Sequence, residues 1–220
     1  MALSNYSQQN SIFSQILTTN KKSNSQVLQD KTRMLQEKLE QAVINPNVLS
    51  KKLTLEQYFN IISRFYISYI QIEKRLIRLE RQVNVLPASP YNSRLSQLEA
   101  ELLSISSLLD CNLPIPAPNF IALGLGSKEQ QYWGIRYALD SFSQTAKMLF
   151  PLMELTIGKK YSVELSFWKK LCHLERDWLK TLTAIDTLSI LDIERSVLIT
   201  SAQETYILIS ENMAGLKPGH

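Results

Sequence analysis

The chain of 220 residues is 45% hydrophobic and contains only 6 glycines and 8 prolines. A chain of this length buries one sizeable core, and the shortage of helix-breaking residues favours long regular segments. Its 24 lysines and arginines are interleaved with 20 aspartates and glutamates, for a net charge of +4. That pattern is typical of a solvated helical surface. It allows a weak preference for acidic ligands and does not indicate a nucleic-acid groove.

The first 24 residues are polar, with one short amphipathic segment at 12–17. They lack the apolar core of a signal peptide, and no stretch of the chain approaches the ~20 apolar residues of a transmembrane helix. We therefore expect a soluble, cytoplasmic protein with no membrane insertion. Its organisation would be an N-terminal segment at 1–24, one helical domain at 25–214 and a flexible tail at 215–220.

The stretch LQDKTRMLQEKLEQA at 28–42 places Leu28, Thr32, Gln36 and Glu40 at a strict four-residue spacing. Residues four apart are neighbours on the surface of a helix, so this spacing predicts one stripe along a helix. The stripe combines an apolar, a hydroxyl, an amide and a carboxylate side chain.

Helical periodicity dominates the rest of the chain. Apolar residues recur at threes and fours from residue 55 to about 81, after a Thr54–Gln57 pair typical of a capping box. Prolines and glycines predict an irregular connection at 111–127. No segment alternates as a strand does, so we expect an all-α, single-domain, multi-helix protein. Further helices are predicted at 94–109, 128–153, 163–185 and 192–213.

Cysteine and histidine are scarce. Cys111 and Cys172 are too few and too far apart for a metal motif or a disulfide framework, and we expect both to be small buried residues. His220 ends the chain, and His173 is predicted to lie in the middle of a helix. We interpret His173 as a structural or surface residue, with iron ligation as the weaker alternative, and otherwise predict no metal site.

The stripe Leu-x3-Thr-x3-Gln-x3-Glu resembles the proximal helix of haem oxygenases, Leu-x3-Thr-x3-His-x3-Glu. In that family the histidine ligates haem iron and the glutamate hydrogen-bonds its ring. Similar segments follow in the same order: LTLEQYFNIISRFYISYIQIEKRL, YWGIRYALDSFSQTAKMLF, SFWKKLCHLERDWLKTL and a last helix with Ala202, Thr205 and Tyr206. The resemblance covers 25–212. It implies a haem-oxygenase-like fold, and the chain looks like a bacterial haemin-binding protein that would suit iron acquisition.

On the proximal side, the chain departs from the family at the ligand. Gln36 occupies the histidine position, and glutamine is a poor iron ligand because its amide oxygen is neutral and its nitrogen has no available lone pair. Glu40 then has no imidazole to orient. The position that usually supplies a cation to a haem propionate is Gln29, which carries no charge.

On the distal side, the family has glycines that let the helix backbone approach the porphyrin. In the register that we prefer, set by the sequence YALD, the first glycine is Ser141 and the following pair is Thr145 and Ala146. Phe142 then replaces a polar distal group.

A shifted register, set by Arg136 and Tyr137, makes the pair Ser143 and Gln144. It would retain Asp140 as the aspartate that orders distal water in the animal enzymes. In the preferred register Asp140 instead matches a glutamate of the bacterial relatives. The glycine pair is lost in both registers.

The favoured hypothesis is a protein that binds haemin or a related tetrapyrrole between helices, with weak or unconventional iron ligation, and does not degrade it. It would be a monomer or a weak dimer. One alternative is a biliverdin-producing haem oxygenase with a different axial ligand, either His173 or a tyrosine. Another is a structural or interaction module with a filled pocket. The residues that the resemblance places at the ligand are Thr32, Gln36, Glu40, Tyr137, Ser141 and Thr145, with Lys180 as a propionate partner.

Overall fold

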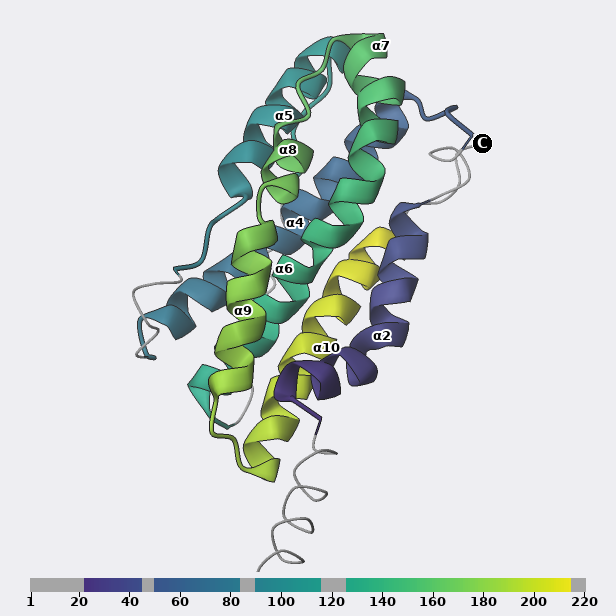
Figure 1. Cartoon of the computed structure of the whole chain (residues 1–220). Coiled ribbons are helices and arrows are strands. Elements are labelled where there is room, and N and C mark those ends of the chain that lie inside the picture. Colours follow the sequence, from purple (N-terminus) through teal and green to yellow (C-terminus); the bar gives the residue numbers. More distant parts are fainter. Residues whose placement is uncertain (1–21, 45–49, 84–89, 116–125, 215–220) are drawn as a thin grey trace, which may run out of the picture.

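A computed structural model describes residues 22–44, 50–83, 90–115 and 126–214. Every regular element in these ranges is helical (Figure 1), which confirms the all-α class. None of these helices is long and apolar enough to cross a membrane. The elements are α2 (Asn24–Val43), α4 (Leu55–Glu80), α5 (Leu95–Leu109), α6 (Lys128–Met153), the π-helix η1 (Glu154–Gly158), α7 (Lys159–Tyr161), α8 (Ser166–Cys172), α9 (Glu175–Thr187) and α10 (Asp192–Ala214).

Two helices begin with the capping that their sequences favour. In α4, the Thr54 hydroxyl accepts from the Gln57 backbone N–H, and the Gln57 side chain accepts from the Thr54 N–H. Ser23 and Gln26 form the same reciprocal arrangement at the start of α2. Each box satisfies backbone donors that a helix start otherwise leaves unpaired.

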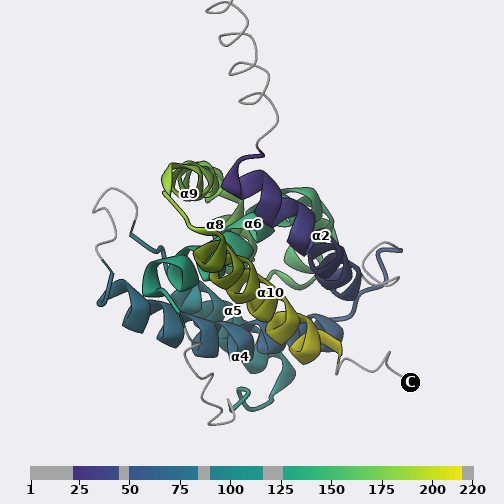
Figure 2. The same ribbon diagram turned by 90° about the horizontal axis from the view of Figure 1, so that it is seen from below.

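The long helix α6 is the centre of the bundle, with α4, α8, α9 and α10 packed around it (Figures 1 and 2). Gly134 permits a close approach of α6 to α10. A β-carbon at Gly134 would lie 2.4 Å from the backbone oxygen of Leu198 in α10. Any side chain at this position would therefore push the two helices apart.

Helix α2 lies at the edge of the bundle, against α10 and the end of α9 (Figures 1 and 2). Its N-terminus is fastened to the end of α9. The Asn24 amide donates to the carbonyls of Ile185 and Leu188, and Ser25 donates to Asp186 from both its N–H and its hydroxyl. The buried apolar residues that hold α2 on the bundle are Leu28, Leu39 and Val43.

The predicted helix at 163–185 is wrong, because the chain forms α8 and α9 with a break at His173 and Leu174. The His173 N–H donates to the carbonyls of Lys169 and Lys170, which tightens the last turn and changes the chain direction. Both helices pack on α6, and the change of direction lets α8 also pack on α5 while α9 also packs on α2. His173 is therefore an exposed residue at a helix junction and does not lie in mid-helix.

The prediction for the cysteines also fails. Cys111 is exposed just beyond the end of α5, and Cys172 is only partly buried. Neither is the small core residue that we expected. The amphipathic segment at 12–17 and the tail at 215–220 lie outside the described residues.

Candidate functional site

The predicted stripe forms on α2 as expected. Thr32 is fully buried, and its hydroxyl donates to the Leu28 carbonyl at 2.8 Å within the helix. Gln36 and Glu40 are half-buried, one and two turns further along. We call Thr32, Gln36 and Glu40 the α2 stripe.

Three residues on α6 at the same four-residue spacing are turned toward α2 and α10. Tyr137 contacts Thr32 of α2, Ser141 lies 2.5 Å from the Tyr206 hydroxyl of α10, and Thr145 reaches Glu40 of α2. We call Tyr137, Ser141 and Thr145 the α6 stripe. The fold thus brings together six of the seven residues that the sequence pointed to.

The two stripes meet directly at Glu40. Its Oε1 atom accepts a hydrogen bond from Gln36 Nε2 at 3.1 Å and another from Thr145 Oγ1 at 2.6 Å. No described residue donates to the other carboxylate oxygen, and no described lysine or arginine pairs with this side chain. Among the described residues, the half-buried Glu40 side chain thus meets only neutral donors, and both donate to the same oxygen.

This contact closes the space between the two helices. A flat ring between two surfaces needs van der Waals separation on both faces, about 7 Å in total. Glu40 and Thr145 are at hydrogen-bond distance, so a planar ligand fits here only when α2 and α6 separate.

Two grooves lie elsewhere on the molecule. One, of about 280 Å³, runs between α4, α6 and α10, past Arg75, Ile135 and Leu208. The other, of about 340 Å³, lies where α2 begins, beside Asp186 and Arg195. Residues of the two stripes line neither groove.

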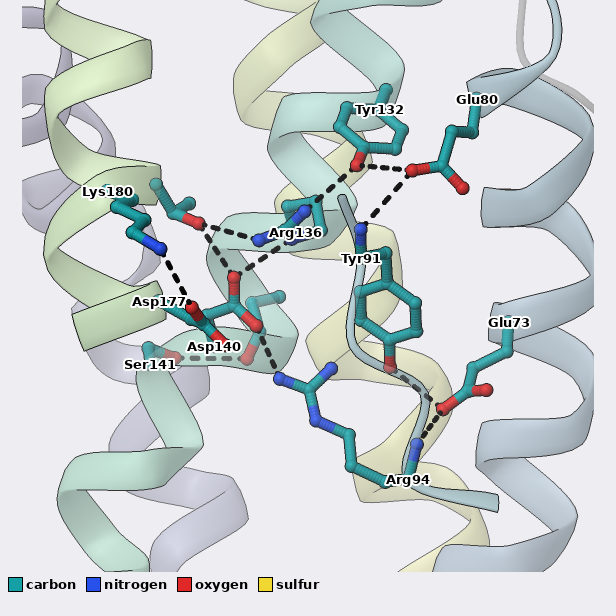
Figure 3. A network of polar contacts seen from close by, with 12 residues as sticks. Glu73, Glu80, Tyr91, Arg94, Tyr132, Arg136, Asp140, Ser141, Asp177 and Lys180 are labelled. Carbon is teal, nitrogen blue, oxygen red and sulfur yellow. Dashed lines mark hydrogen bonds and ion pairs between the residues drawn. The ribbon is translucent and has the colours of Figure 1, made fainter. Parts of the chain in front are cut away.

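Lys180 does not join the stripes. It lies exposed on α9 and pairs with Asp177 at 3.6 Å (Figure 3). His173 is also apart: its ring Nδ1 lies 2.6 Å from the Lys169 carbonyl, and none of its described contacts is with either stripe. Phe142 packs on Phe65 and Trp168 in the aromatic core, away from α2.

Asp140 points away from α2, into a buried network that the sequence did not predict (Figure 3). It accepts hydrogen bonds from Arg94, from Arg136 Nε at 2.9 Å and from the Thr181 hydroxyl at 2.7 Å. Arg136 also donates to the Tyr132 hydroxyl at 2.9 Å. Arginine usually lies at the surface, and Arg94 is 46 residues from Asp140, so local sequence gave no signal for this ion pair.

The network fixes the charge of Asp140. Burial alone would raise the pKa of this carboxyl, but the two adjacent guanidinium groups outweigh burial and hold the pKa below its ordinary value. Asp140 is therefore an ionised, fully paired structural carboxylate. Tyr137 differs: burial raises the pKa of its phenol, although its contact with Thr32 opposes the shift, so it remains a neutral hydroxyl.

Comparison with known proteins supports the fold only. Protein-family models and curated protein sequences give no match to the chain. Among solved structures, the haem oxygenase from Leptospira interrogans matches with a TM-score of 0.63 and 14% sequence identity, over 89% of this chain and 100% of that one. The chain therefore has an all-α, haem-oxygenase-like fold.

The residues of the two stripes do not fit a haem iron ligated by nitrogen. Gln36 has no lone pair to offer from its nitrogen, and the buried phenol of Tyr137 is held neutral. No group of three or more histidine, cysteine, aspartate or glutamate side chains in the described part of the chain is placed to hold a metal ion. The stripes do offer hydroxyl, amide and carboxylate groups to a polar, flat ligand.

Proposed function

We propose that the protein binds haemin or a related tetrapyrrole between the α2 and α6 stripes and does not degrade it. Gln36 takes the place of the family's proximal histidine, and Thr145 and Ala146 take the place of its distal glycine pair. The ligand is held through its macrocycle and not through a strong axial bond. The position of Thr145 opposite Glu40 supports this register, because Gln144, the alternative pair member, is exposed.

One observation carries the proposal: the two helices face each other with polar side chains. If the two helices stayed permanently packed against each other, we would expect apolar side chains between them. A buried carboxylate without a cationic partner costs folding free energy. Here Gln36, Glu40 and Thr145 meet in a partly buried contact that no lysine or arginine of the described ranges joins. This contact joins the two helices that the resemblance in sequence assigns to the two faces of the ligand, which supports the proposal.

The test is a titration of haemin into the purified protein, followed by absorption spectra. Gln36→Trp should place a bulky side chain where the ring would have to enter between the stripes, and so weaken binding by tenfold or more. Glu37→Trp is the matched control, because Glu37 is the next residue of the same helix and is exposed. Equal affinities for both variants would place the ligand elsewhere.

A second candidate is an interaction module without a ligand. The Thr145–Glu40 hydrogen bond favours it, because this bond already joins the helices that would have to separate. If the folded wild-type protein showed no saturable binding of haemin or of a metal-free porphyrin, the binding function would be overturned and the second candidate favoured.

A further inference from the structure

The groove between α4, α6 and α10 takes no part in the proposed function, and its residues point to a second binding site. We propose that this groove binds a small carboxylic acid with an apolar chain, such as a medium-chain fatty acid, with the carboxylate on Arg75. Its volume of about 280 Å³ lies just below the ~300–1,000 Å³ of most ligand pockets, so the ligand is small. At about 30 Å³ for each water-sized group, the groove holds a chain of roughly nine such groups.

Arg75 is a buried cation whose donors are poorly paired. Its side chain is only 5% exposed, and burying a charge is costly unless its hydrogen-bonding groups find partners. Among the described residues, Nη1 donates to Glu204 at 3.3 Å, Nη2 donates to Gln131 at 3.5 Å, and Nε has no acceptor. Hydrogen bonds between a guanidinium and a carboxylate are ordinarily about 2.7–2.9 Å long. A second, better placed acceptor would therefore stabilise this guanidinium.

Glu204 is a partner that a ligand can displace. Its side chain is 48% exposed and meets Arg75 through one long contact, and such pairs contribute little to stability. A ligand carboxylate could take this place with both of its oxygens while Glu204 turns into solvent. Glu211, the other acidic residue that lines the groove, is exposed and lies seven residues further along α10. Its distance along the helix is about 10.5 Å, more than the Debye length of about 8 Å, so salt largely screens its repulsion of an anion.

The rest of the groove suits an apolar chain. Its walls carry aliphatic side chains from all three helices, namely Ile72, Ile135, Ile207 and Leu208. Ile72 and Ile135 are buried, whereas Ile207 is 41% exposed. A chain lying in the groove would remove this apolar surface from water, which is favourable. An acid group at Arg75 and an aliphatic chain beside these residues together define the ligand class.

The test compares octanoate, octanol and octylamine, which share one chain length and differ in the charge of the polar group. Isothermal titration calorimetry measures their binding to the purified protein, at concentrations below those at which they form micelles. We expect octanoate to bind at least about tenfold more tightly than octanol, the difference typical of charge-assisted hydrogen bonding, and octylamine to bind most weakly. Acetate has the acid group without the chain, and it should bind at least about a hundredfold more weakly than octanoate.

Three variants place the ligand in the groove. Arg75→Gln should abolish the preference for octanoate over octanol, whereas Lys74→Gln, at the exposed neighbouring residue of α4, should retain it. Glu204→Gln should bind octanoate about threefold more tightly or better, because the competing charge is gone. Glu204 lies at the surface, so this variant decides the question even if Arg75→Gln does not fold.

The inference would be overturned by tighter binding of octylamine than of octanoate, which would assign the groove to a cation held by its carboxylates. It would also be overturned by octanoate binding that Glu204→Gln leaves unchanged or weakens, or by the absence of saturable octanoate binding to the wild type. None of these variants alters the α2 or α6 stripe, so the haemin titration tests the proposed function separately.

Discussion

Thr145 on α6 donates a hydrogen bond to Glu40 on α2 at 2.6 Å, which joins the two helices between which we propose that the ligand binds. The bond stabilises the closed arrangement, and a ligand at the proposed site would have to break it. At that site the strength of this one contact would affect both the stability of the protein and the rate of ligand binding.

Thr145→Val keeps the shape of the side chain and removes the donor. We expect the free energy of unfolding to fall by up to about 1.5 kcal/mol, and tetrapyrrole association to become faster because no bond closes the site. Urea unfolding and stopped-flow absorbance measure the two effects. Thr156→Val is the matched control, since Thr156 is also buried but donates only to the Leu152 carbonyl of its own helical turn. A faster association in the control as well would contradict the role of the Glu40 contact.

Gln36→His places a histidine at the position that we propose corresponds to the proximal histidine of haem oxygenases. Glu40 already accepts a hydrogen bond from position 36, so an imidazole there would have its orienting partner one turn away. We expect tighter haemin binding and an absorption spectrum shifted toward nitrogen ligation. Gln144→His, on the exposed side of α6, is the control. An unchanged spectrum in Gln36→His would mean that position 36 does not face the ligand.

Asp140→Asn tests the buried network. The substitution leaves Arg94 and Arg136 buried without their common carboxylate, and breaking a buried pair in this way typically costs about 3–5 kcal/mol. Asp177→Asn is the control, because its partner Lys180 is exposed and such a pair contributes less than about 1 kcal/mol. Urea unfolding at neutral pH measures both variants. Equal losses would show that Asp140 is not the centre of a buried ion pair.

Glu101 predicts a pH dependence of stability. Burial raises the pKa of this carboxyl to about 7, although hydrogen bonds from Tyr58 and the Phe167 N–H oppose the shift. The unfolded chain has the ordinary value of 4.5, so between pH 4.5 and 7 the folded protein binds more protons. The free energy of unfolding should therefore fall as the pH rises through this window, by up to about 3 kcal/mol.

Urea unfolding at pH 5, 6, 7 and 8 checks this prediction, and Glu101→Gln supplies the comparison because it cannot ionise. We expect the variant to lose most of the decline seen in the wild type between pH 5 and 8. An equal decline in both proteins would assign it to other groups.

How much of the fold could be predicted from the sequence depends on how far apart in the chain the interacting residues lie. The α2 stripe and the start of α4 were predicted because spacing and capping act within one or two turns of a helix. The break at His173 was missed, because no proline or glycine marks it. It accompanies a difference in packing, since α8 and α9 both lie on α6 but α8 also contacts α5 and α9 also contacts α2. Tertiary context overrides local propensity there.

The site was predicted in part for the same reason. Helical spacing and the resemblance together picked out both stripes, but neither gave the distance between them, so the closing contact of Thr145 with Glu40 came only with the structure. The ion pairs of Asp140 could not be predicted from the sequence either. They join residues far apart in the chain, and a lone arginine such as Arg94 gives no sign in the sequence that it is buried.

The last prediction concerns turnover. Oxygenase chemistry needs oxygen bound at the iron beside bare helix backbone, whereas Thr145 and Ala146 carry side chains in the register proposed above, and Ala146 is fully buried. We therefore expect no biliverdin from the wild-type protein supplied with haemin and an electron donor, and little or none from Gln36→His alone. Product should require Thr145→Gly and Ala146→Gly in addition, at a helix cost of roughly 1 kcal/mol for each glycine. Absorption spectra of the reaction mixture measure the product. The same double glycine substitution without Gln36→His is the control. Biliverdin formed at enzymatic rates by the unmodified protein would contradict the proposed binding function and support an oxygenase with another axial ligand.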